Sequence, residues 1–342
     1  MQAVYSERHR EHYPEHFLKS GERLQNPEMP ERAERLAQFV EASGRELVAP
    51  DDYGQGPLAD VHTPEYLAFL ETIHERWRQL EEASAEVIPN VHPNGRHGAY
   101  PASPVGQAGY HLADTACPVG AGTWEAARMS ANSAVHAAEL VLNEADCAYA
   151  LCRPPGHHAF ADMAGGFCYL NNTAIAAQRL LTQSDRVAIL DVDLHHGNGT
   201  QGIFYRRPDV LTVSLHADPA AFYPFFWGYA DERGAGEGLG YNYNLPLPLG
   251  TGDDAYLDTL DMALTRIERF APDMLVVALG LDAYRGDPLA GMAISTDGFA
   301  RIGETIGRYD LPCVLVQEGG YLTEALGRNL VSFLDGFEDA RG

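Results

Sequence analysis

The stretch VAILDVDLHHGNG, residues 187–199, decides the fold because a short apolar run leads directly into acidic and histidine side chains. Four further apolar runs share its first half: CAYALC (147–152), VLTVSL (210–215), MLVVALG (274–280) and CVLVQEGG (313–320). Helical patterns lie between several of these runs, at residues 171–181, 254–269, 297–307 and 322–335. β-rich runs alternating with helices predict a parallel sheet covered on both faces. No linker is evident, so we expect one α/β domain over residues 1–342.

Polar, titratable residues follow each apolar run. They are His157 and His158 after CAYALC, Asp191 to His196 after VAIL, His216 after VLTVSL, Asp282 after MLVVALG, and Glu318 to Tyr321 after CVLVQ. In open parallel α/β sheets, ligands bind beyond the carboxyl ends of the strands. The sequence therefore predicts a functional site at one edge of the sheet.

Asp191, Asp193 and His195 share one face of an extended segment, because side chains alternate there and neighbours on that face lie ~6.5 Å apart. A metal ion can bridge two such neighbours, so we assign Asp193 and His195 as ligands and place Asp191 one step deeper. Asp282 is the best candidate for a third ligand. Two carboxylates and one imidazole suit zinc with an open coordination position, and Fe(II) accepts similar ligands. Helix capping or a salt bridge is the simpler alternative for an Asp-Val-Asp strand end.

The pair His157-His158 follows a Pro-Pro-Gly turn, and neutral imidazole is the usual general base near pH 7. Tyr321 follows two glycines, and a phenol beside a metal-bound carbonyl can stabilise a developing oxyanion. Phe167 and Tyr223 are candidate walls of a cleft. Taken one at a time, each of these residues is also compatible with ordinary packing.

Acidic residues dominate the charge: 48 Asp and Glu against 24 Lys and Arg give a formal net charge of −24. Such a field disfavours nucleic acid and anionic membranes as partners. It fits either a cationic substrate or a strongly solvated surface. The five scattered cysteines, without a CxxC pair, favour reduced thiols and a cytoplasmic location. We expect neither a signal peptide nor a membrane span.

Several motifs together resemble the histone deacetylase superfamily of zinc amidohydrolases: RPPGHH (153–158), GFCYLNN (166–172), DVDLHHGNGTQ (191–201), VSLH (213–216) and EGGY (318–321). Within it, GTWEAA (122–127), HADPA (216–220) and FFWGYADERGAGEG (225–238) look most like the bacterial acetylpolyamine amidohydrolases. The resemblance implies a three-layer αβα domain of the arginase and deacetylase type, with a mostly parallel eight-stranded sheet. It also implies that residues 88–122, a Gly- and Pro-rich stretch without clear periodicity, form an insertion that shapes the mouth of the site and a homodimer interface.

The same resemblance assigns roles to residues. Zinc would be held by Asp193, His195 and Asp282. His158 would act as general base and then general acid, His157 would pair with Asp191, and Tyr321 would polarise the substrate carbonyl. Gly166, Phe167 and Tyr223 would line the substrate tunnel, and Asn198, where some relatives have Asp, would leave its histidine partner less basic. Structural K⁺ ions would use two sets, Asp191, Asp193, His195, Ser214 and Leu215 in one and Phe204, Val210 and Tyr241 in the other.

The expected reaction is hydrolysis of an N-acetylated amine to acetate and the free amine. Asp114 is the only acid in the segment after Gln107, which favours short, singly charged substrates such as acetylcadaverine and acetylputrescine over acetylspermidine. The alternatives are a deacetylase acting on acetyl-lysine in proteins or peptides and an inactive module that only binds acetylated amines. A binuclear manganese ureohydrolase is disfavoured because a second Asp-rich strand end is missing.

Overall fold

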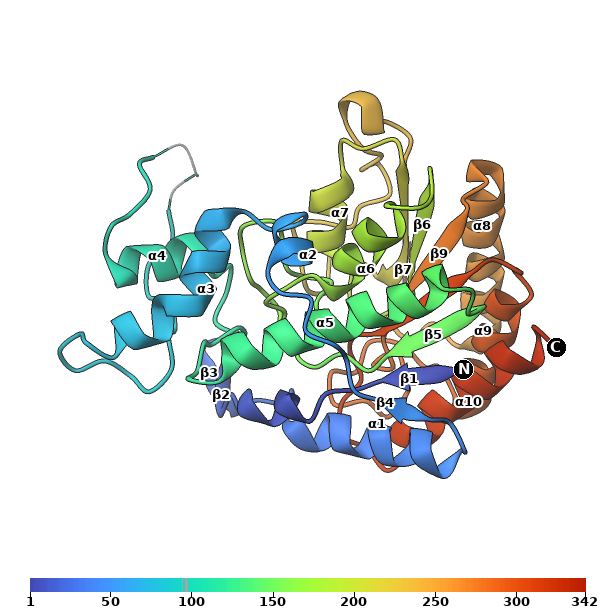
Figure 1. Ribbon diagram of the computed structural model, residues 1–342, viewed down its shortest axis with the longest axis horizontal. Helices are drawn as coiled ribbons and strands as arrows, with labels where there is room; N and C mark the ends of the chain where they lie inside the picture. Colours follow the sequence, from blue (N-terminus) through green and yellow to red (C-terminus); the bar gives the residue numbers. More distant parts are fainter. Residues whose placement is uncertain (94, 96–97) are drawn as a thin grey trace.

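A twisted parallel sheet forms the centre of the computed structural model, which describes residues 1–93, 95 and 98–342 (Figure 1). Its strand order is β4-β1-β5-β10-β9-β6-β7-β8, and every pairing between neighbours is parallel. The strands are β1 (Gln2–Val4), β4 (Leu47–Val48), β5 (Cys147–Ala150), β6 (Val187–Asp191), β7 (Val210–Ala217), β8 (Asn242–Leu247), β9 (Met274–Leu279) and β10 (Cys313–Gln317). A separate antiparallel hairpin is formed by β2 (His16–Lys19) and β3 (Glu22–Gln25). The predicted eight-stranded sheet is confirmed.

Helices cover both faces of the sheet, which completes the predicted three layers. One face is covered by α5 (Thr123–Leu142) and α6 (Asn172–Leu180), and the other by α1 (Pro30–Ala42), α8 (Asp253–Phe270), α9 (Thr296–Gly307) and α10 (Leu326–Asp339). Alternation along β6 shows why both faces are apolar: Val187 and Ile189 pack under α5 and α6, whereas Ala188 and Leu190 pack on the opposite side.

The stretch 88–122, of which residues 94, 96 and 97 lie outside the described part, includes regular structure that the sequence did not predict. It contains α4 (Pro104–His111), whose start is capped by the Ser103 hydroxyl accepting from the Gly106 N–H. The lack of clear periodicity in this stretch therefore did not exclude a helix. α3 (Pro64–Trp77) and α4 project together beyond the β2–β3 hairpin (Figure 1).

The remaining short elements are η1 (Glu7–Glu11), α2 (Gly56–Ala59), α7 (Asn198–Phe204) and η2 (Gly236–Gly238). α7 begins at the end of the quoted motif and so fixes the chain directly after the strand end. Within the described residues, no helix has the length and apolar character needed to cross a bilayer.

Candidate active site

Four neighbouring strands, β5, β10, β9 and β6, bring the polar strand ends to one edge of the sheet. Asp191 is the last residue of β6, and Asp282 lies three residues beyond β9. Glu318 follows β10 directly, and the His157-His158 pair follows β5 after a short turn. The sequence-predicted groups therefore meet in space because parallel neighbours end at the same edge.

Asp193, His195 and Asp282 form a buried set of three potential metal ligands whose ligand atoms lie within 4.8 Å of one another. The His195 Nδ1 lies 3.2 Å from Asp193 Oδ1 and 3.0 Å from Asp282 Oδ2, so one imidazole nitrogen faces both carboxylates. Burial opposes a charged imidazole, but hydrogen bonds to these two carboxylates raise the pKa of His195 to about 9. Burial and then the charge of Asp193 raise the pKa of Asp282. Two buried carboxylates thus require a cation between them, and this O, O, N donor set fits zinc or Fe(II).

Backbone groups hold both carboxylates in place. Asp193 accepts from the N–H groups of His195 (2.8 Å) and Gly319 (2.8 Å), and Asp282 accepts from that of Leu194 (3.0 Å). A Cβ on Gly319 would lie 2.3 Å from Asp282 Oδ2 and 2.6 Å from Asp193 Oδ2. The two carboxylates thus leave no room for a side chain at position 319, a role of this glycine that the EGGY motif did not reveal.

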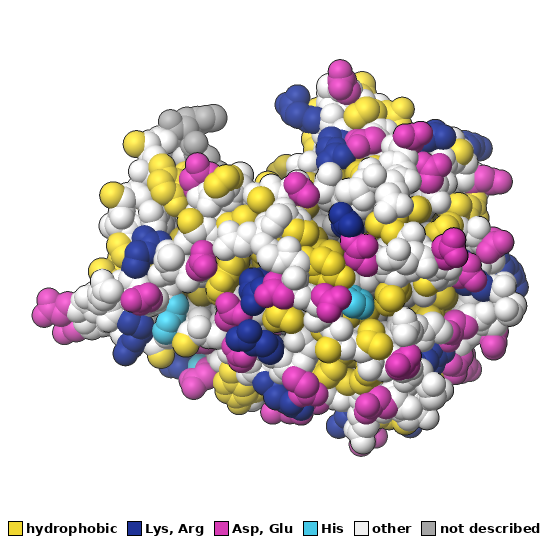
Figure 2. Space-filling view, in the orientation of Figure 1, with side chains coloured by type: hydrophobic (Ala, Val, Ile, Leu, Met, Phe, Trp, Pro, Cys, Tyr) yellow, Lys and Arg dark blue, Asp and Glu magenta, His cyan; other side chains and the backbone are white. Residues whose placement is uncertain are grey.

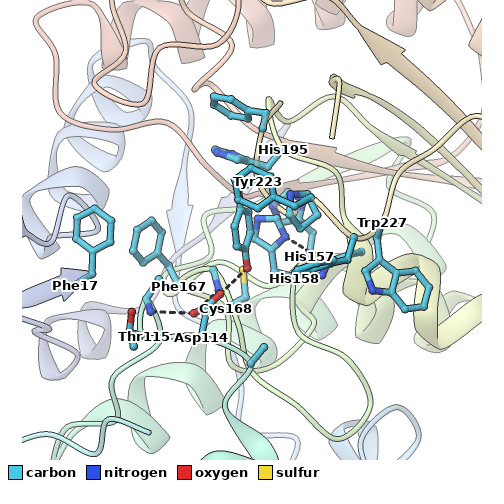
Figure 3. A pocket seen from close by; sticks show the side chains of 18 of the residues that line it. Phe17, Asp114, Thr115, His157, His158, Phe167, Cys168, His195, Tyr223 and Trp227 are labelled. Atoms are coloured by element: carbon cyan, nitrogen blue, oxygen red, sulfur yellow. Dashed lines mark hydrogen bonds between the residues drawn. The ribbon is translucent and has the colours of Figure 1, made fainter. Parts of the chain in front are cut away.

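His157 and His158 lie side by side with ring centroids 4.1 Å apart, but they differ in their surroundings (Figure 3). The His157 Nδ1 lies 3.0 Å from Asp191 Oδ2, and its Nε2 lies 3.8 Å from Asp193 Oδ1. Burial opposes its charged form, but Asp193 and Asp191 raise the pKa of His157 to about 10. The two carboxylates therefore favour the protonated, positively charged form of His157.

His158 has the opposite character. Its Nδ1 donates to the Asn198 Oδ1 at 2.7 Å, which leaves Nε2 as the unprotonated nitrogen. Burial lowers the pKa of His158 well below its usual value, and the charges on His157 and His195 lower it further. A neutral imidazole beside the metal set is the arrangement that a general base needs.

Tyr321 is buried, and its position is fixed by backbone and ring contacts. Its N–H donates to Asp287 Oδ2 at 2.9 Å, its ring packs on Phe167 with centroids 5.9 Å apart, and the Arg32 guanidinium lies 5.3 Å from its ring centroid. Burial and then the charge of Asp282 raise the pKa of the phenol, which therefore remains a hydrogen-bond donor. Arg32 also donates to the backbone carbonyls of Glu318 and Gly320.

A cavity of about 820 Å³ leads to these groups, and aromatic rings form part of its lining. Phe167 and Tyr223 are among them as predicted, and Figure 3 shows Phe17 of β2 and Trp227 further along the wall. The predicted tunnel residue Gly166 lies between His158 and Tyr223, with no room for a Cβ.

Asp114 ties the wall of this cavity together. Its Oδ2 accepts from the Tyr223 hydroxyl at 2.7 Å (Figure 3). The same oxygen accepts from the Gly166 N–H at 3.1 Å, and Oδ1 accepts from the Ala116 N–H at 2.9 Å. The sequence marked Asp114 only as the acid of its segment. Its contacts make it a residue that positions the tunnel wall.

Glu318 has a comparable supporting role that the sequence did not reveal. Glu318, His157 and Cys168 form a second group whose potential metal-ligand atoms lie within 4.8 Å of one another. The Glu318 carboxylate, however, accepts hydrogen bonds from the N–H groups of Gly156 (2.7 Å) and His157 (3.0 Å) and from the Thr173 hydroxyl (2.6 Å). These bonds fix the turn that carries the histidine pair.

The residues predicted for monovalent cations lie behind the metal set and near the start of β7. Asp191 pairs in register with Ser214, and Leu215 follows it on β7. Phe204 ends α7, Val210 starts β7, and Tyr241 directly precedes β8. Binding of K⁺ at either set stays a prediction.

Comparison with known proteins places this site in a defined family. The histone deacetylase domain matches residues 26–337. The acetylpolyamine amidohydrolase of Burkholderia pseudomallei is 52% identical over 97% of both chains, and acetylpolyamine amidohydrolase 1 of Pseudomonas aeruginosa is 46% identical over 99% of both. The crystal structure of an acetylpolyamine aminohydrolase from B. pseudomallei superposes with a TM-score of 0.98 at 50% identity over both full chains. The HDA15 HD domain superposes with a TM-score of 0.79 at 26% identity, covering all of this chain and 89% of that one.

Proposed function

This chain belongs to the histone deacetylase domain family, and we propose that it hydrolyses short N-acetylated amines, releasing acetate and the free amine. The observation that carries the proposal is the buried set of Asp193, His195 and Asp282 at the end of an aromatic cavity, beside a neutral His158. The names of the relatives, acetylpolyamine amidohydrolases over nearly the full chain, support the substrate class.

Zinc or Fe(II), held by the two carboxylates and His195, would supply Lewis acidity toward the acetyl oxygen and acidify a water molecule. His158 Nε2 takes the proton from this water as it attacks the acetyl carbon. The Tyr321 phenol donates a hydrogen bond to the acetyl oxygen as negative charge develops there. His158 then returns the proton to the nitrogen of the leaving amine, while the charged His157 stabilises the negative intermediate without transferring a proton.

The cavity favours a small, cationic substrate. Aromatic walls accept the methylene chain and can hold an ammonium group over a ring face. Asp114 provides negative charge at the wall, but hydrogen bonds already engage both its oxygens. One distal ammonium is therefore better accommodated than several, which favours acetylputrescine and acetylcadaverine over acetylspermidine.

Further proposals concern the working state of the protein. We expect one catalytic domain over residues 1–342, a homodimer in which residues 88–122 narrow the cavity mouth, structural K⁺ at the two predicted sets, and a cytoplasmic location. Acidic side chains are spread over the surface seen in Figure 2, which fits the expectation that nucleic acid is not a partner.

One assay tests the proposed function. Acetate release is measured with the zinc-loaded protein and with the Fe(II)-loaded protein, on acetylcadaverine, acetylputrescine, acetylspermidine and an acetyl-lysine peptide. We expect kcat/KM to be highest for the two acetyldiamines. A preference for the peptide would favour the alternative, a protein deacetylase, and activity on none of the four would refute deacetylation.

The matched control for this assay is His158→Ala. The metal set does not include His158, so the variant should bind zinc as the parent does and yet lose turnover. Retained activity would remove His158 from the mechanism.

A further inference from the structure

Four arginines gather at the end of the sheet opposite to the catalytic cavity. Arg186 directly precedes β6, Arg266 and Arg269 lie in the last turns of α8, and Arg233 lies in the segment before β8. They line two adjoining hollows of about 400 and 360 Å³ that share Arg266 and Arg269. Because the catalytic residues follow the carboxyl ends of the strands, this groove, here called the arginine groove, is separate from the proposed active site.

The arginine groove contains positive charge without compensation. In the described part of the chain, none of its four arginines has a carboxylate oxygen within 4.0 Å, whereas at least 11 other arginines do. Its described lining residues include no Asp or Glu. Other described arginines also lack such a partner, but these four line adjoining hollows without an acidic side chain, which gives a local positive surface in a chain with 48 acidic residues and a net charge of −24.

Contacts hold two of the guanidinium groups in place. The Arg266 side chain is half-buried, and its Nη2 donates to the Gly240 carbonyl at 2.6 Å. Arg186 Nη1 donates to the Phe270 carbonyl at 2.7 Å, with the guanidinium 5.5 Å from the Phe270 ring centroid. Arg269 lies one helical turn from Arg266, so both project from the same side of α8. Burial, together with the charge of Arg269, lowers the pKa of Arg266. An anion bound between the two guanidinium groups would stabilise the charged form of Arg266.

Two tyrosines complete the groove and indicate the kind of anion. Tyr243 lines one hollow and Tyr241 the other, next to the arginines. Guanidinium groups bind phosphate oxygens through paired N–H donors, and aromatic rings beside them can stack on a planar group. We propose that the arginine groove binds a phosphate group, either as inorganic phosphate or as part of a phosphorylated small molecule such as a nucleotide.

Calorimetric titration of the zinc-loaded protein with inorganic phosphate, and separately with AMP, at constant ionic strength tests this proposal. The test variant is Arg266→Gln combined with Arg269→Gln. The control combines Arg301→Gln with Arg308→Gln, which removes the same charge from arginines paired with Asp254 and Glu304. We expect saturable binding to the parent and the control, and binding weaker by at least ~10-fold in the test variant.

Absence of saturable binding to the parent, or equal binding in the two double variants, would overturn the proposal. Equal binding would show that phosphate sits at the catalytic metal or responds to net charge, and that the arginines only protect the exposed edge of β8. Tighter binding of AMP than of phosphate would identify a nucleotide, and equal binding of both would identify any phosphate ester or the free ion. Arg269→Gln alone, at an exposed position, repeats the test if the double variant fails to fold.

Discussion

Replacing Gly319 with alanine tests whether the two carboxylates form the metal site. The added Cβ would lie 2.3 Å from Asp282 Oδ2 and 2.6 Å from Asp193 Oδ2, whereas ordinary contact begins near 3.4 Å, so the nearer oxygen must move by about 1 Å. Metal sites tolerate deviations of only ~0.2 Å in ligand distance. Gly319 has no positive φ, so alanine meets no backbone strain there and the effect is steric.

We expect Gly319→Ala to weaken zinc binding by ~100-fold or more, the upper range for disturbed ligand support, and to reduce turnover accordingly. Zinc affinity is measured by competition with a chromophoric chelator, and folding by circular dichroism of the metal-free protein. Gly56→Ala is the matched control, because a Cβ there meets nothing within 4 Å. Zinc affinity within a factor of three of the parent, with activity retained, would refute the assignment of Asp193 and Asp282 as ligands.

Three further predictions concern catalysis and stability. Tyr321→Phe should lower kcat by ~10²–10³ with little change in KM, since only the hydrogen bond to the oxyanion is lost; a change confined to KM in steady-state kinetics would contradict this role. Asn198→Asp places a carboxylate where an amide oxygen now lies 2.7 Å from His158 Nδ1, so the pKa of His158 should rise. The acid limb of the profile of kcat/KM against pH should therefore move to higher pH. An acid limb that does not move would exclude His158 as the base. Burial lowers the pKa of His62 from 6.5 to about 4. The Nε2 atom of this histidine accepts a hydrogen bond from the Asn171 N–H at 2.9 Å. The folded state therefore binds fewer protons, and ~3 kcal/mol of stability, fully present above pH 6.5, is lost as the pH falls toward 4; denaturant unfolding at pH 7.5 and 5 should show a smaller pH dependence for His62→Gln than for the parent.

Local sequence was sufficient for the central strands and most helices. The runs before Asp191 and Asp282 are continuous apolar segments buried on both faces, so their strand character is visible without knowledge of the neighbours. Three strands of the sheet were not predicted from their own sequence: the short β1, which lies inside the sheet, and the edge strands β4 and β8. β4 has two residues and β8 contains polar Asn242 and Asn244, so each depends on its partner strand rather than on its own pattern.

The candidate site divides in the same way. The sequence determined which chemical groups are available, because each group follows its strand in the chain. These groups are the acids and imidazoles after β6 and β9, the histidine pair after β5 and the tyrosine after β10. Alternation along an extended chain, however, could not explain how Asp193 and His195 meet, since β6 ends at Asp191 and the ligands lie in the irregular segment beyond it. Only the tertiary structure decided their geometry, because the distances among ligands on separate strands are set by strand order and by backbone N–H groups from a third segment. It also decided the role of Asp114, whose neighbours are distant in sequence and adjacent only after folding.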